Sequence, residues 1–135
     1  MRVLLDTNVL VAAFATRGLC ADLLRHVLVE HRLLIGEVVL EELQRALRRK
    51  LKLPAQSVSA IIDFLREQEV VDRPARAAAA PARDPADRWV LASALDARAD
   101  VLVTGGDDLL ELTAGQAGVR ILSPRDFWEI ARRKR

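Results

Sequence analysis

The sequence has one cysteine, no tyrosine and few aromatic residues, and it lacks long apolar runs. Cys20 cannot form a disulfide within the chain, and neither His26 nor His31 is spaced to build a zinc site with it. With aromatic residues at 4%, base stacking is poorly supported as a binding mode. No segment approaches the roughly 18 apolar residues of a membrane helix, and the N-terminus lacks a signal-peptide pattern. We therefore expect a cytoplasmic protein with no membrane partner.

The overall composition is that of an ordinary globular domain. The 135 residues are 51% apolar and 30% charged, enough to bury a core without disulfides or metals. We expect a single domain spanning residues 1–135. The net charge is only +2, although the sequence pI is about 9.2. This balance permits a nucleic-acid partner without requiring one.

Short apolar runs alternate with helical patterns along the chain. Strands are predicted at 3–5, 33–35, 101–103 and 120–122, with a weaker candidate at 69–71. Apolar residues at three-and-four spacing predict helices in the segments 19–28, 40–51, 58–65 and 89–95. The proline-interrupted stretch 73–83 is expected to be an irregular connection. Alternation of this kind predicts an α/β fold with a parallel sheet and helices on both of its faces.

Acidic residues follow two of the predicted strands directly. Asp6 ends the first apolar run, and Asp107 and Asp108 follow the strand at 101–103 after Thr104 and two glycines. Ligands bind parallel sheets in the crevice outside the carboxyl ends of the strands. Capping of the following helix is the alternative role for the acids at 107 and 108.

Two predicted helices carry further acids. Asp84 before Pro85 is explained as a helix N-cap, and Asp87 then falls in the first turn, where the helix dipole favours a charged carboxylate. Glu41 has Arg45 four residues on and is explained as a surface ion pair. Glu42 borders the apolar stripe with no partner one turn away, and such an acid is unfavourable unless a cation neutralises it.

These acids predict a metal site if they converge at one end of the sheet. Asp6, Glu42, Asp87 and one of the acids near 107 would repel one another and could not all stay ionised without divalent cations. Ligands that are all oxygen atoms suit Mg²⁺ or Mn²⁺. A site of this kind activates water and stabilises the departing oxygen of a phosphodiester, which points to phosphoryl transfer on nucleic acid.

Four motifs, in order and spacing, resemble the PIN-domain ribonucleases, and most closely the VapC-like toxins of bacterial toxin–antitoxin pairs. They are LLDTNVLV at 4–11, LEELQRAL at 40–47, DPADRWVLASAL at 84–95 and VLVTGGDDLLEL at 101–112. The resemblance covers essentially the whole chain. It implies a three-layer fold with a five-stranded parallel sheet of order 3-2-1-4-5. It also implies a metal-dependent endoribonuclease that cleaves single-stranded RNA with Mg²⁺ or Mn²⁺, a cognate antitoxin and a homodimer.

Carried over residue by residue, the resemblance assigns roles to positions in all four motifs. Asp6 matches the first metal ligand, Glu42 the helix acid and Asp87 the third acid. Asp6, Asp87, Asp107 and Asp108 are the metal-ligand candidates, and Asp6, Glu42, Asp87 and Asp107 the catalytic ones. Thr7, Asn8 and Thr104 match residues that orient the ligands, and turn or cap chemistry is their alternative role.

One position departs from the family pattern. Gly106 stands where the family usually has its fourth aspartate, and Asp107 and Asp108 follow it. Asp108 matches a second acid two places later, whereas Asp107 replaces the missing acid only if the glycines let the loop shift by one residue. Arg17, Arg83 and Arg88 are candidates for contacts with RNA phosphates, and plain surface is the alternative for each.

Two other functions are open at this point. A catalytically impaired PIN domain that binds RNA or protein would explain Gly106. The stretch DTNVL at 6–10 loosely resembles the nucleophile motif of haloacid-dehalogenase phosphatases. That function is disfavoured, because Asn8 stands in place of the second aspartate of the motif and no lysine lies between Lys52 and Lys134. The carboxylates do not distinguish RNA from DNA as substrate.

Overall fold

The computed structural model describes residues 1–133. Its elements, in chain order, are β1 (Arg2–Leu5), α1 (Thr7–Ala15), α2 (Leu19–Glu30), β2 (Arg32–Gly36), α3 (Glu37–Arg49), α4 (Ala55–Arg66), β3 (Glu69–Val71), α5 (Pro85–Asp96), β4 (Val101–Val103), α6 (Asp107–Leu110), α7 (Ala114–Ala117), β5 (Arg120–Leu122) and α8 (Pro124–Arg133). All five predicted strands are present. The stretch 73–83 contains neither helix nor strand, as predicted.

The five strands form one parallel sheet with the order β3-β2-β1-β4-β5. This order and the helical flanks confirm the predicted α/β fold with sheet order 3-2-1-4-5. The central strands β1 and β4 are buried almost throughout, which explains why they read as continuous apolar runs. The edge strand β3 is only half-buried, and its sequence signal was correspondingly weaker.

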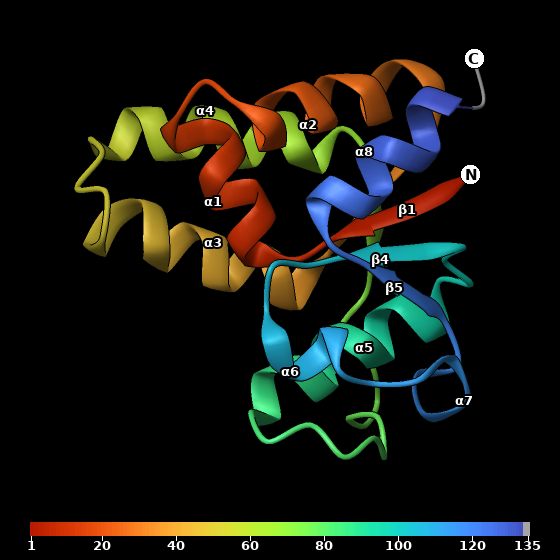
Figure 1. Ribbon diagram of the computed structural model, residues 1–135. Coiled ribbons are helices and arrows are strands. Elements are labelled where there is room, and N and C mark those ends of the chain that lie inside the picture. The colour runs from red at the N-terminus through yellow and green to blue at the C-terminus, as the bar shows by residue number, and fades with distance from the viewer. Residues whose placement is uncertain (134–135) are drawn as a thin grey trace.

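Helices cover the sheet on both sides. Figure 1 shows α2 and α8 above the strands and α5 below them, while α3 and α4 extend to one side. Helix α3 contacts α1, α4, α5 and β2, so it lies where the two helical layers meet. The carboxyl ends of β1 and β4 lie next to the starts of α1 and α6, because one residue separates β1 from α1 and three separate β4 from α6.

The apolar spacing of α3 explains how this helix is held. Val39, Leu43 and Leu47 recur at four-residue intervals and are fully buried, whereas Glu41, Gln44 and neighbouring arginines are exposed. One face of α3 therefore packs into the core, and the opposite face is free to carry charge. Within residues 1–133 no single helix is long and apolar enough to cross a membrane; α1 and α2 would qualify only as a pair bent by 107°.

Candidate active site

Asp6 occupies the junction between β1 and α1. It is 5% exposed, and its backbone N–H donates to the carbonyl of Val103 on the neighbouring strand at 2.9 Å. Its side chain caps α1, with Oδ1 accepting a hydrogen bond from the backbone N–H of Thr7 at 2.8 Å. Asp6 is thus fixed by the sheet on one side and by the helix on the other. Burial raises the pKa of Asp6, and hydrogen bonds from the Thr104 hydroxyl and the Thr7 N–H lower it by less.

The second oxygen of Asp6 accepts a hydrogen bond from a residue far away in the sequence. The Thr104 hydroxyl, which is fully buried, donates to Asp6 Oδ2 at 2.7 Å. Asn8 Nδ2 lies 3.4 Å from the same oxygen, and Asn8 Oδ1 accepts from the Gly105 N–H at 3.0 Å. Thr104 Oγ1 in turn accepts from the Gly106 N–H. Asn8 and Thr104 therefore lock the loop after β4 to Asp6, as ligand-orienting residues would.

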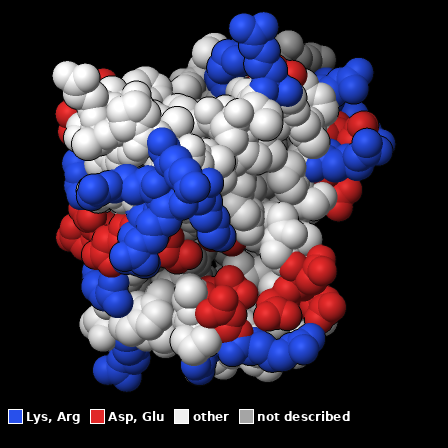
Figure 2. Space-filling model, turned by 90° about the vertical axis from the view of Figure 1, so that its left-hand side faces the viewer, with Lys and Arg blue, Asp and Glu red and all other residues white. Residues whose placement is uncertain are grey.

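A cavity of about 380 Å³ opens beside Asp6. Its wall comes from α1, α3, the start of α5 and the residues before it. The lining residues are Asp6, Thr7, Asn8, Val11, Ala12, Glu42, Ala46, Lys50, Asp84, Ala86 and Asp87. On the side of the molecule at the left of Figure 1, acidic side chains lie around a hollow, and Lys and Arg gather in a band beside them (Figure 2). The structure thus brings Asp6, Glu42 and Asp87 to one cavity.

The acids in this cavity destabilise one another's charged forms. The pKa of Glu42 is raised by partial burial and then by the charge of Asp6, and Arg45 only partly offsets this effect. The pKa of Asp87 is raised from 3.8 to about 6, first by partial burial and then by Asp6, Asp84 and Asp108. A bound cation would reverse both effects, because it favours the ionised carboxylates.

Asp84 belongs to this group of acids, a role that the sequence interpretation missed. It does cap α5, since Oδ1 accepts from the Ala86 N–H at 2.9 Å. It also lines the cavity together with Asp87, and its negative charge acts on Asp6, Glu42 and Asp87. The three-residue spacing between Asp84 and Asp87 was the available signal, because residues at that spacing share one side of a helix start.

The acids after β4 are placed differently. Asp107 is exposed at the first position of the short helix α6, and Asp108 is half-buried with its Oδ1 3.6 Å from Arg83 Nε. Neither of them is among the described residues that line the cavity. Asp108 is near enough for its charge to act on Asp87. Gly106 precedes them with an ordinary φ of −81°, so the loop uses no conformation that only glycine adopts.

The three arginines assigned to RNA lie in separate environments. Arg17 is exposed beyond the C-terminal end of α1, a helix of nine residues and about 13 Å that begins beside Asp6. Arg83 is exposed beside Asp108. Arg88 is half-buried, and its Nε is buried without a hydrogen-bond partner among the described residues.

The cavity offers the donor chemistry of a site for a hard cation. Its polar lining supplies only oxygen and amide groups besides Lys50. Thr7 lines the cavity, and its Oγ1 is buried without a hydrogen-bond partner in the described chain. No three described His, Cys, Asp or Glu side chains are arranged as ligands of one ion. The residues therefore fit Mg²⁺ or Mn²⁺ by chemistry, and binding would have to draw them together.

A family model for the PIN domain matches residues 2–107, which is most of the chain. The chain belongs to the PIN domain family. PIN domains are nucleases, and they generally use divalent metals. In this PIN domain, the acidic cavity lies at the carboxyl end of β1, and the matched range includes Asp6, Glu42 and Asp87. No curated protein matches the sequence.

Solved structures with the same fold extend over nearly the full chain. VapBC2 from Rickettsia felis, solved with a DNA fragment from its promoter, has a TM-score of 0.64 at 16% identity, covering 91% of this chain and 98% of that chain. VapBC-1 from nontypeable Haemophilus influenzae has a TM-score of 0.60 at 18% identity, covering 93% and 99%. FitAcB from Neisseria gonorrhoeae has a TM-score of 0.58 at 15% identity, covering 91% and 98%. At these identities the likeness shows a shared fold.

Proposed function

We propose that this PIN domain is a metal-dependent endoribonuclease that hydrolyses single-stranded RNA. The observation that carries the proposal is the position of Asp6. It is a buried carboxylate at the end of the central strand, held on both oxygens, and it borders a cavity that three further acids line. A fold does not need so many acids together, since their mutual repulsion destabilises it. A phosphodiester with divalent cations accounts for them.

Each residue has a role that follows from its contacts. Asp6, Asp84 and Asp87 would hold Mg²⁺ or Mn²⁺. Glu42 lines the same cavity from α3 and would act as the general base. Asn8 and Thr104 would keep Asp6 oriented. The bound ion would supply a nucleophilic water and neutralise charge on the leaving oxygen.

Gly106 favours a second candidate function, a PIN domain that binds RNA or protein without cleaving it. The position that carries a fourth acid in most of the family has no side chain here. Asp107 and Asp108 do not line the cavity in its place. Asp84 is the acid that does, which is why cleavage is the function we favour.

We also propose that the chain is the toxin of a toxin–antitoxin pair. The support is that proteins sharing its fold over nearly their full length are VapBC and FitAcB assemblies. The inhibiting partner would be a cognate antitoxin that covers the acidic cavity. A homodimer is the expected assembly of the free chain, and sedimentation of the purified protein measures it directly.

Cleavage of a labelled single-stranded RNA tests the enzymatic proposal. The purified protein is incubated with RNA in Mn²⁺, in Mg²⁺ and in chelator, beside the variant Asp6→Asn. We expect cutting that requires metal and falls by at least about 100-fold in Asp6→Asn, because the substitution removes the buried charge but keeps the shape. Single-stranded DNA of the same sequence, run in parallel, decides between the two nucleic acids.

Gly106→Asp separates the two candidate functions. Cutting by the unaltered protein would support the nuclease. Activity that emerges only in Gly106→Asp, with RNA binding already present in the unaltered chain, would support the binding module instead. If neither protein cuts or binds the RNA with metal present, the proposed function is wrong for this substrate.

A further inference from the structure

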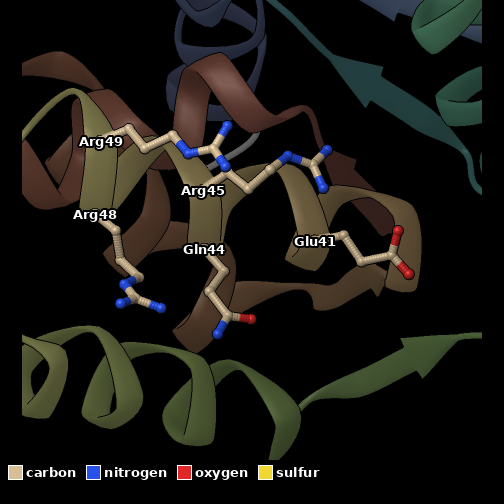
Figure 3. Close-up of a pocket in the computed structure, with 5 residues that line it drawn as sticks. All are labelled: Glu41, Gln44, Arg45, Arg48 and Arg49. Atoms are coloured by element: carbon tan, nitrogen blue, oxygen red, sulfur yellow. The ribbon is translucent and has the colours of Figure 1, made fainter.

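The exposed face of α3 carries a groove of about 500 Å³ that is lined by Glu41, Gln44, Arg45, Arg48 and Arg49. Figure 3 shows that Arg45 and Arg49 extend to the same side of the helix and that Arg48 extends to the other. Arg45 and Arg49 are four residues apart, so their attachment points differ by about 6 Å along the helix axis. This separation is close to the distance between successive phosphates of an extended nucleic-acid strand.

None of the three arginines that line this groove forms a salt bridge with a described acidic side chain. Among the described residues, Arg2, Arg25, Arg32, Arg66, Arg73 and Arg83 all form salt bridges, and Arg45, Arg48 and Arg49 form none. Arg45, Arg48, Arg49 and Lys50 are all exposed. Four cations within two turns repel one another, and a bound anion would relieve this repulsion.

The groove lined by Arg45, Arg48 and Arg49, here called the outer groove, continues into the acidic cavity. A second groove of about 270 Å³ is lined by Thr7, Glu42, Arg45, Ala46, Arg49 and Lys50. It shares Arg45 and Arg49 with the outer groove and shares Thr7, Glu42 and Lys50 with the cavity that contains Asp6. A polymer bound in the cavity can therefore continue without interruption along the exposed face of α3.

We infer that the single-stranded nucleic acid enters or leaves the acidic cavity along α3, with Arg45 and Arg49 binding two successive phosphates and Lys50 contacting the strand where it reaches the cavity. The inference rests on the proposed function, and it names where the substrate backbone lies. Guanidinium groups suit this role because they donate two parallel hydrogen bonds to one phosphate. The basic residues also explain how a polyanion approaches a cavity lined by acids.

An acidic protein segment is the other polyanion that could occupy the groove. The nucleic acid is favoured because the path ends at the carboxylates that would hold a divalent cation against a phosphodiester. A protein partner buries side chains as well as charge, and among the described lining residues of the two grooves the only apolar side chain is that of Ala46.

Binding of a fluorescent single-stranded RNA at several salt concentrations tests the inference. The background is Asp87→Asn with Mn²⁺ present, so that the strand binds without being cut. The test variant adds Arg45→Gln and Arg49→Gln. The matched control adds Arg125→Gln and Arg132→Gln, two exposed arginines on α8. Glutamine preserves helix propensity in both pairs.

We expect the α3 pair to weaken RNA binding at least about 10-fold at low salt, and to reduce the slope of log K against log salt by about 1.4, because each lost phosphate contact removes about 0.7. The α8 pair should leave both values unchanged. Equal binding and equal slopes in the two pairs would overturn the inference. Polyglutamate serves as the probe for an acidic protein segment. If the α3 pair abolishes binding of polyglutamate but leaves RNA binding unchanged, the inference is also overturned.

The failure of the inference can be told from failure of the proposed function. If the Asp87→Asn background protein binds RNA and the unaltered protein cuts it, but the α3 pair has no effect, only the path along α3 is wrong. If the unaltered protein does not cut RNA and neither it nor the Asp87→Asn background binds RNA at any salt concentration, both are wrong.

Discussion

Asp84 combines two tasks that can be separated by substitution. Its Oδ1 caps α5, and its charge contributes to the acidic cavity. Asparagine is as good an N-cap as aspartate, so Asp84→Asn should keep the helix and remove only the charge. We expect this variant to unfold at nearly the same temperature as the unaltered protein and to bind Mn²⁺ at least about 10-fold more weakly, as measured by calorimetry.

Gly106→Asp adds a carboxylate near the cavity and so complements the loss of the carboxylate in Asp84→Asn. A Cβ at Gly106 would lie 3.4 Å from Thr104 Oγ1 and 3.7 Å from Asn8 Nδ2, so the added side chain starts beside the residues that hold Asp6. It should restore Mn²⁺ binding to Asp84→Asn. The control is Asp107→Asn, an exposed acid outside the cavity. Equal losses in Asp84→Asn and Asp107→Asn would contradict a special role for Asp84.

Asp87 makes the stability of the metal-free protein depend on pH. Its pKa is raised from 3.8 to about 6, so the folded state disfavours the ionised carboxylate. The contribution of Asp87 to stability is therefore fully present below about pH 4 and is lost as the pH rises through about 6. Since a metal requires the ionised form, the stabilisation by Mn²⁺ should increase over the same range.

Thermal unfolding with and without Mn²⁺, between about pH 4 and about pH 7, measures both effects. Asp87→Asn is the control, because it should flatten this part of the pH dependence and reduce the gain from Mn²⁺. An unchanged pH profile in Asp87→Asn would assign the dependence to another group, of which Glu42 and Asp6 are the candidates with raised pKa values.

Helix α3 links the core to the site, because its opposite faces have opposite chemistry. Leu47 is fully buried one turn after Leu43, and Glu42 and Arg45 project from the same helix toward the cavity and the grooves. Leu47→Ala should reduce the free energy of unfolding by about 2 to 5 kcal/mol, through lost burial and the cavity left behind. Denaturation in urea measures it.

The exposed neighbour Gln44 provides the control for this element. Gln44→Ala should change the free energy of unfolding by less than about 0.5 kcal/mol. A loss in Leu47→Ala that is no larger than the loss in Gln44→Ala would mean that α3 is not anchored by its apolar stripe.

In the whole molecule, one sheet joins two helical layers, and each layer contains one tryptophan. Trp89 lies on α5 below the sheet and Trp128 on α8 above it (Figure 1). Because both layers pack on the same strands, we expect them to unfold together. Trp89→Phe and Trp128→Phe each leave a single fluorescent reporter on one side.

The test compares fluorescence with far-UV circular dichroism within each variant. The two signals should give the same urea midpoint in Trp89→Phe and again in Trp128→Phe. A fluorescence transition that precedes the loss of helix in one variant would show that its layer unfolds separately.

The local sequence was enough to predict the elements and the family. Strands appear as apolar runs and helices as three-and-four spacing, and both signals come from residues that are near one another in the chain. Asp6, Glu42 and Asp87 could be selected because each stands at a strand end, a helix edge or a first turn. The sheet order followed from the resemblance carried by the four motifs.

Distances across the fold could not be obtained in this way. Thr104 and Asp6 are 98 positions apart, and only the pairing of β1 with β4 brings the hydroxyl to the carboxylate. Asp84 had a sufficient local explanation as a cap, so its second role was hidden until α5 was placed beside α1 and α3. The arginines of α3 looked like ordinary surface for the same reason.

The sequence by itself therefore determined which segments are strands and helices and which acids follow the strands or lie on the helices. It could do so because burial periodicity is a local property of the chain. The tertiary structure decided which of those acids share a cavity, that Asp84 faces it while Asp107 does not, and that unpaired arginines border it. Those facts depend on how separate elements pack, since electrostatic interaction depends on distance in space and not on separation in sequence.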